Sequence, residues 1–285
     1  MMRSMFAAVS GLRNHQTMMD TIASNISNVN TFGFKAQRAT FKDSLYQNLS
    51  GAGAPTPPSL GGTNPKQVGL GMSLNSIDTL MTQGNAQSTG VVTDMMIQGD
   101  GFFRVASAAS TFGGVGGNDL AAGGEQYTRA GNFSFDNAGY LVTTKGQYVL
   151  GTVDATGNVG RLQVDPATTA AINMDAAGAL TAISTAGVQT PIGTLSLAKF
   201  ANAPGLERLG ENLWRQSNNS GAAVNGAPGG AAGHGNVVPG ALEMSNVDLA
   251  LEFTNMIIAQ RGFQANGRAI TTSDEMLSEL VNLKR

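Results

Sequence analysis

The sequence contains no cysteine in its 285 residues and only two histidines, His15 and His234. The lack of cysteine excludes a disulfide framework and a thiolate metal site. Neither histidine is spaced with acidic residues in the way that metal ligands are, so no metal site is expected. No apolar run approaches the ~18 residues that a membrane-spanning helix needs, so no membrane insertion is expected.

Charged residues are also scarce. They make up 13% of the chain, against about 25% in ordinary soluble domains. The formal net charge of −2 indicates neither nucleic acid nor an acidic membrane surface as a partner. A chain with so little charge has little with which to cover a free monomer surface. We therefore expect neighbouring subunits to cover much of that surface.

No pattern of catalytic residues stands out. The glycine-rich tract at 113–117 is not followed by Lys-Ser or Lys-Thr and a helix, which argues against a phosphate-binding loop. No nucleophile has a recognisable base beside it in the sequence. We therefore expect no enzymatic activity and no cofactor.

The N-terminus lacks the features of a secretory signal peptide. The apolar stretch from Met5 to Leu12 is short and is broken by Ser10 and Gly11. No small-residue cleavage site follows it. The protein is expected either to stay in the cytoplasm or to leave by a route that reads an uncleaved N-terminus.

The last forty residues carry an apolar stripe with alternating spacings of four and three. This pattern is typical of a coiled-coil seam, because 3.5 residues per turn keeps one stripe facing a partner helix. Ser245, followed three residues later by Asp248, predicts the helix start. A helix over 246–283 would be on the order of 55 Å long and would need partners along its length. The apolar members of the stripe are Leu249, Phe253, Met256, Phe263, Ile270, Leu277 and Val281.

The first stretch of the chain carries the same spacing, at Met2, Met5, Val9, Leu12, Met19, Ala23 and Ile26. Either the two terminal helices pack as an ordinary bundle, or they pair as a coiled coil and then pack against other copies. Polar or small residues at seam positions weaken a dry two-helix core, so we favour the second interpretation, a self-assembly seam. These interruptions are Gln16, Gln260, Gly267 and Asp274.

The middle of the chain changes to a period of two with frequent turn signals, which predicts short strands. Asp136-Asn137-Ala138-Gly139 is a hairpin signal, and Trp214 is predicted to be a packing anchor. The predicted fold class is α+β, mainly β, with long terminal helices paired as a coiled coil and a central all-β domain. Strands are expected at 72–79, 91–97, 102–105, 148–153, 162–164, 180–183 and 192–197.

The expected domains follow from these patterns. Residues 1–35 and 245–285 form the helical domain, and 68–244 form a β-rich outer domain. Residues 36–67, rich in Gly and Pro in their second half, form a connecting arm or loop. Two glycine-rich tracts, 106–124 and 217–236, are expected to be flexible unless neighbours hold them.

Several motifs in order resemble those of one family, the bacterial flagellar rod and hook proteins. The N-terminal motif spans 23–35, with Ser24 where the family usually has a second Asn. A C-terminal motif spans 240–248, and a closing-helix motif spans 256–266. Segments 61–71 and 99–103 are similar to the hook protein in particular. The motif residues singled out are Asn25, Asn28, Asn30, Gly33, Phe34, Lys35, Ser245, Asn246, Val247, Gln260 and Arg261.

The resemblance implies a structural subunit that is exported unfolded, without signal cleavage, by the flagellar type III apparatus. Such subunits polymerise into a helical tube whose inner layer is the paired terminal helices. The implied partners are other copies, rod and hook–filament junction proteins, the export apparatus and the hook cap. The implied location is the flagellar hook and basal body.

Within the family, the motif from Asn64 to Gly71 favours the hook, the flexible joint between rod and filament. The twenty-one residues between Gln47 and Gly69 are as many as expected in the distal rod, the rigid drive shaft, which stays the alternative. A peptidoglycan-cutting rod protein would need a further domain, for which the chain leaves no room. A secreted coiled-coil adhesin fits the terminal seams but not the internal motifs.

Overall fold

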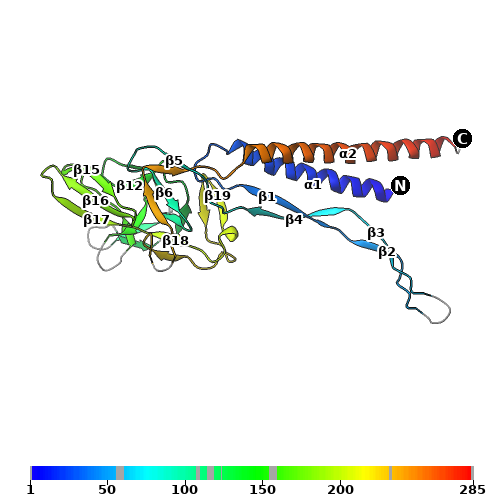
Figure 1. Cartoon of the computed structure of the whole chain (residues 1–285), viewed down its shortest axis with the longest axis horizontal. Coiled ribbons are helices and arrows are strands. Elements are labelled where there is room, and N and C mark those ends of the chain that lie inside the picture. Colours follow the sequence, from blue (N-terminus) through cyan, green and yellow to red (C-terminus); the bar gives the residue numbers. More distant parts are fainter. Residues whose placement is uncertain are drawn as a thin grey trace. The chain divides into compact units, whose positions relative to one another are not determined.

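The computed structural model describes residues 2–55, 61–106, 110–113, 119–122, 124–153, 159–230 and 233–283. The chain forms two compact units (Figure 1). The first unit consists of Met1–Ser27, Gln37–Leu80 and Asp248–Arg285, and the second of Asn28–Ala36 and Met81–Val247. Both units are therefore discontinuous in the sequence.

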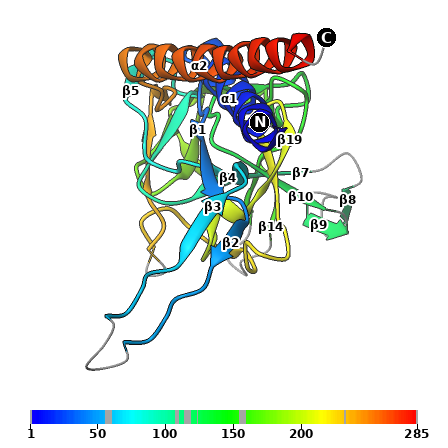
Figure 2. The ribbon, with the colours of Figure 1, turned by 90° about the vertical axis from the view of Figure 1, so that its right-hand side faces the viewer.

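The first unit contains two long helices, α1 (Met2–Ser27) and α2 (Leu249–Asn282). They lie side by side and run in opposite directions, so that the first residues of α1 lie near the last part of α2 (Figures 1 and 2). The carboxylate of Asp248 caps α2 by accepting hydrogen bonds from the amides of Ala250 and Leu251. The prediction of Ser245 as the helix start was therefore wrong, because the acid three residues later supplies the cap.

Two antiparallel strand pairs complete the first unit. Strand β1 (Gln37–Asp43) pairs with β4 (Met72–Thr79), and β2 (Tyr46–Ser50) pairs with β3 (Lys66–Gly69). Residues 36–67, expected to be an arm or loop, thus contain two strands and the start of a third. Helix α1 holds β4 through Asn14, whose side-chain amide donates to the carbonyl of Met72.

The second unit is built from short antiparallel strands. Its largest sheets have the strand orders β19-β20-β10-β7-β18-β21 and β15-β16-β17-β13-β14-β9-β8, and β11-β12, β22-β6 and β23-β5 form separate pairs. The strands are β5 (Ala86–Ser88), β6 (Met95–Gln98), β7 (Phe102–Ala106), β8 (Thr111–Gly113), β9 (Asp119–Ala122), β10 (Glu125–Thr128), β11 (Phe133–Phe135), β12 (Leu141–Thr143), β13 (Leu150–Thr152), β14 (Val159–Arg161), β15 (Thr169–Met174), β16 (Ala179–Ser184), β17 (Gln189–Leu195), β18 (Leu197–Lys199), β19 (Glu207–Gly210), β20 (Leu213–Arg215), β21 (Val224–Gly226), β22 (Asn236–Pro239) and β23 (Ala241–Glu243).

Two apolar clusters form the core of the second unit. The larger gathers buried residues from both large sheets, among them Phe103, Leu150 and Leu195. The smaller contains Trp214, whose ring packs at 6.3 Å from that of Phe102. Trp214 is buried, so its predicted role as a packing anchor is confirmed.

The predicted hairpin is also confirmed. Strands β11 and β12 pair across the turn, in which the amide of Gly139 donates to the carbonyl of Asp136 at 3.0 Å. Gly139 has φ +80°, a left-handed conformation that a side chain would strain. The prediction of a strand at 162–164 was wrong: the strand there is β14, which ends at Arg161, and only Gln163 makes an isolated bridge.

The predicted fold class is confirmed at the level of a mainly β chain with short strands and two terminal helices. The tract 106–124 contains β8 and β9, and its residues 107–109, 114–118 and 123 lie outside the described ones. The tract 217–236 contains β21 and the first residue of β22, and residues 231–232 lie outside the described ones. Neither α1 nor α2, as far as they are described, has a stretch long and apolar enough to cross a membrane.

Candidate functional site

The buried side chains of α1 and α2 are mostly small or polar. The buried positions of α1 are Ala8, Gly11, Asn14, Thr21, Ile22 and Asn25, and those of α2 are Glu252, Ala259 and Ser273. Two glycines let the helices approach closely. A Cβ at Gly11 would lie 2.7 Å from the amide nitrogen of Asn266, and one at Gly262 would lie 2.5 Å from the imidazole carbon Cε1 of His15. Each helix thus offers a glycine opposite a polar side chain of the other.

None of the predicted seam residues is fully buried. Val9, Ala23, Leu249, Phe253, Phe263 and Val281 are exposed, and Met5, Leu12, Met19, Ile26, Met256, Ile270 and Leu277 are half-buried. The buried positions of α1 are mostly displaced by one residue from the predicted stripe. Packing against other copies therefore stays a prediction for these side chains.

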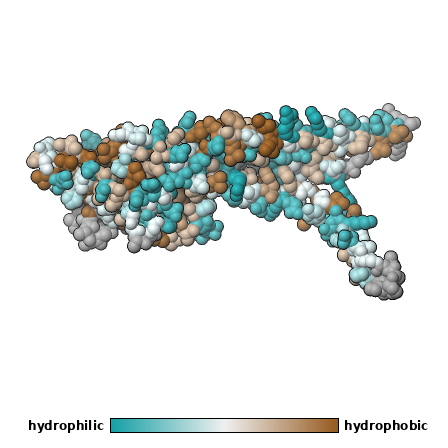
Figure 3. Space-filling view, in the orientation of Figure 1, coloured by the Kyte–Doolittle hydropathy of each residue, from teal (hydrophilic) through white to brown (hydrophobic). Residues whose placement is uncertain are grey.

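Large apolar side chains gather on the exposed face of α2. Leu251, Ile257 and Ile258 are each 58% exposed, and Phe253 is 51% exposed. Figure 3 shows apolar residues collected over the first part of this helix. These exposed side chains are more apolar than the buried residues of α2. A helix at a protein surface normally buries its apolar face and exposes its polar one.

Asn25 lies at the end of α1 and holds three parts of the first unit together. Its side-chain amide donates to the carbonyl of Gln37 at 2.7 Å and to the Glu252 carboxyl at 2.8 Å, and its oxygen accepts from the Gln37 amide at 2.9 Å. These bonds fix α1 to α2 and to the start of β1. Burial raises the pKa of the Glu252 carboxyl, the Asn25 hydrogen bond lowers it, and the charge of Asp248 raises it.

Lys35, the last residue of the N-terminal motif, is fully buried in the second unit. Its ammonium group donates to Glu243 at 2.6 Å and to the carbonyl of Thr82 at 2.8 Å. The second oxygen of Glu243 accepts from Arg129 at 3.1 Å. Burial lowers the pKa of the Lys35 ammonium, the Glu243 carboxylate raises it, and the charge of Arg129 lowers it. Breaking such a pair leaves an uncompensated charge inside the protein.

Gly33 and Asn246 fix the backbone around this ion cluster. The Gly33 amide donates to the Glu243 carbonyl at 2.8 Å, and its φ of +69° is a left-handed conformation. A Cβ there would meet the Ala130 amide nitrogen at 2.6 Å, so only glycine fits. The Asn246 side chain accepts from the Ala36 amide at 2.7 Å and donates to Thr82. The N-terminal and C-terminal motifs therefore meet in one polar cluster.

The remaining motif residues differ in burial and in their partners. Phe34 is buried, Asn28 accepts a hydrogen bond from Thr31, and Asn30 is exposed. Ser245 accepts from the amide of half-buried Val247. Gln260 and Arg261 are exposed on α2.

Three charged residues that organise these contacts were not predicted from the sequence: Arg129, Glu243 and Glu252. Glu243 lies inside the quoted segment 240–248, and its isolation in a charge-poor chain is a signal that could have identified it. No sequence signal indicates Arg129, because only the folding of the strands brings it next to Glu243. Within the described parts of the chain, no group of three His, Asp or Glu side chains could hold a metal ion. The polar cluster can hold the N-terminal and C-terminal motifs together, and α2 presents an exposed apolar face.

Comparison with known families matches three parts of the chain. The matching descriptions are "Flagella basal body rod protein" over residues 5–35, "Flagellar hook protein FlgE/F/G D1 domain" over 96–188, and "Flagellar basal body rod FlgEFG protein C-terminal" over 238–283. These matches include both terminal motifs and the residues of the ion cluster.

Individual relatives match from end to end. The chain is similar to the flagellar basal-body rod protein FlgG of Bacillus subtilis (strain 168), 44% identical over 285 residues and covering 100% of both chains. It is 36% identical over 286 residues to the FlgG of Borreliella burgdorferi, again covering 100% of both. It is 31% identical over 465 residues to the flagellar hook protein FlgE of Treponema pallidum, with 100% of both covered. The chain therefore belongs to the family of flagellar basal-body rod and hook proteins.

Proposed function

We propose that the chain is the structural subunit of the distal rod, the rigid drive shaft of the flagellar basal body. One observation carries the proposal. The rod-protein alignments run over almost the same length as this 285-residue chain, whereas the hook-protein alignment runs over 465 positions. Hook proteins of that size contain a segment that has no counterpart here. The hook, favoured from the motifs at 61–71 and 99–103, becomes the second candidate.

The hairpin β2–β3 supports the rod. The segment between Gln47 and Gly69, whose length favoured the distal rod, contains most of the residues of the paired strands β2 and β3. Leu45, Tyr46 and Leu49 are exposed along it. A two-stranded hairpin is at best marginally stable alone in water, so these apolar side chains are expected to be covered by neighbouring copies. Such contacts would stiffen the polymer.

The terminal helices supply the inner layer of the proposed helical tube. In this proposal α1 and α2 stay paired in a coiled coil, and the seam residues together with the exposed face of α2 pack against the helices of other copies. Burying apolar area contributes about 25 cal/mol per Å², and packing against other copies would cover this face. The function is structural, with rod, hook and junction proteins as axial partners, and export proceeds through the type III apparatus.

Polymers grown from the purified chain and imaged by electron microscopy test this proposal. A distal rod subunit should give straight polymers whose bending fluctuations are small. Curved polymers with large bending fluctuations would favour the hook. A chain that forms no polymer at any concentration would contradict self-assembly itself.

A further inference from the structure

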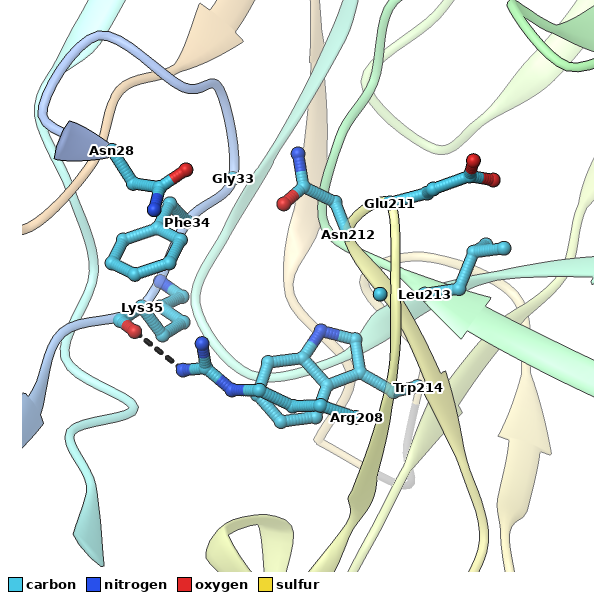
Figure 4. Close-up of a pocket in the computed structure, with 10 residues that line it drawn as sticks. Asn28, Gly33, Phe34, Lys35, Arg208, Glu211, Asn212, Leu213 and Trp214 are labelled. Carbon is cyan, nitrogen blue, oxygen red and sulfur yellow. Dashed lines mark hydrogen bonds between the residues drawn. The ribbon is translucent and has the colours of Figure 1, made fainter. Parts of the chain in front are cut away.

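A cleft of about 210 Å³ opens in the second unit beside the N-terminal motif (Figure 4). One wall is the motif segment with Asn28 and Phe34, and the other is the β19–β20 hairpin with Arg208, Asn212 and Trp214. All these residues belong to one unit, so the cleft is a property of that unit alone.

The Arg208 guanidinium projects between the two walls. Its central carbon lies 5.1 Å from the centre of the Phe34 ring and 4.6 Å from that of Trp214. One of its terminal nitrogens donates to the carbonyl of Lys35, and its Nε is buried without a partner. None of the ion pairs among the described residues includes Arg208, whereas Arg104, Arg129 and Arg215 each pair with a glutamate. Arg208 is thus a stacked cation without a counter-ion.

A two-residue turn between β19 and β20 closes the cleft. Glu211 and Asn212 have φ of 55° and 61°, the only positive values at non-glycine residues in the described part of the chain. Two successive positive φ angles are the geometry of a tight two-residue β-hairpin turn. The turn is held by Asn212, which donates to the Phe32 carbonyl at 3.0 Å, and by the ion pair of Glu211 with Lys145 at 2.6 Å. The acid of the turn, Glu211, is thus paired with Lys145 and not with Arg208.

We propose that this cleft is a carboxylate-binding site, and that its occupant in the polymer is an acidic side chain of a second copy of this chain. Arginine binds carboxylates in a planar, two-pronged geometry, and the aromatic faces on both sides exclude water from such a pair. Charge complementarity supports a second copy as the occupant, because the chain has 19 acidic and 17 basic residues and exposes carboxylates such as Asp20, Asp274 and Glu275. The second-copy part rests on the proposed function, and the carboxylate part does not.

The only tryptophan of the chain, Trp214, lines the cleft and reports on it by fluorescence. Monomeric protein is titrated with N-acetylglycine, which carries one carboxylate, and with the neutral N-acetylglycinamide as the matched probe, at constant ionic strength. We expect a saturable change in emission with the carboxylate and none with the amide. Arg208→Gln should weaken binding at least about tenfold, the loss of one hydrogen bond to a charged group. Arg215→Gln, an exposed arginine already paired with Glu207, should leave binding unchanged.

Equal responses to both probes in the wild-type monomer would overturn the carboxylate site, whether or not the chain builds a rod. No variant is needed for that result, so a misfolded Arg208→Gln cannot obscure it. In the polymer, Trp214 should already emit as in the carboxylate-bound monomer and should no longer respond to N-acetylglycine. A polymer that titrates like the monomer, or a chain that forms no polymer, would overturn the second copy as occupant while leaving the monomer result in force.

Discussion

Replacing Gly262 by alanine places a methyl group where the His15 ring now lies. The new carbon would be 2.5 Å from Cε1 and 2.6 Å from Nε2 of that ring, closer than real contacts allow. Gly267, five residues further along α2, has nothing within 4 Å of the equivalent position. The two glycines share a helix and differ in their surroundings, so Gly267→Ala is a matched control for Gly262→Ala.

The magnitudes follow from two opposing effects. Alanine in place of glycine stabilises a helix interior by up to about 1 kcal/mol. A methyl group forced into occupied space costs about 1–3 kcal/mol. Gly267→Ala should therefore raise the free energy of unfolding by up to ~1 kcal/mol, and Gly262→Ala should lower it by up to ~2 kcal/mol. The difference of about 1–3 kcal/mol between the variants measures the close approach of α1 and α2.

Urea unfolding followed by the helical circular-dichroism signal provides the assay, since nearly all helix in the described residues lies in α1 and α2. His15→Ala in the Gly262→Ala background should restore most of the loss, because it removes the ring that the methyl group meets. If both alanine variants stabilise the chain equally, the close glycine contact between the two helices does not exist in solution.

Three further changes test other parts of the account. Lys35→Met leaves Glu243 deprived of one of its two cations and should cost about 3–5 kcal/mol in urea unfolding followed by Trp214 fluorescence; Lys145→Met, at an exposed ion pair, should change little. Burial raises the pKa of Glu252 above 4.5, so the stability that this group contributes is present below pH 4.5 and lost as the pH rises through the raised value; Glu252→Gln, which keeps the acceptor for Asn25, should remove that dependence in circular-dichroism melts. Leu277→Asp puts a charge on the predicted seam and should abolish polymerisation while Trp214 fluorescence still reports a folded second unit.

Each of these has a contrary result. Equal losses from Lys35→Met and Lys145→Met would show that the buried cluster does not stabilise the fold. An unchanged pH profile in Glu252→Gln would show that this carboxyl titrates normally in the folded chain. Normal polymers from Leu277→Asp would remove that side chain from the assembly contact.

The sequence predicts the strands and helices better than the contacts between them. The hairpin at 136–139 was predictable because its turn residues act locally. The predicted self-assembly seam is an apolar stripe, whereas the close approaches between α1 and α2 occur at Gly11 and Gly262, opposite polar side chains. Periodicity shows which residues share a face of a helix. It does not show which face the other helix of the same chain covers.

The candidate site shows the same limit. The motif marked Gly33 and Lys35, but it could not show that Lys35 is neutralised by Glu243, more than 200 positions away. Arg129 and Arg208 carry no local signal, because their roles arise only where β strands bring distant segments together. The strands β1 and β2 were missed because Phe41, Leu45 and Tyr46 have a helix-like spacing rather than the alternation typical of a strand.

Deleting the gene and imaging isolated basal bodies by electron microscopy tests the central proposal most directly. If the chain builds the distal rod, the deletion strain should show basal bodies whose rod ends short and which carry no hook. A complete rod that lacks only its hook would contradict the account and assign the chain to the hook.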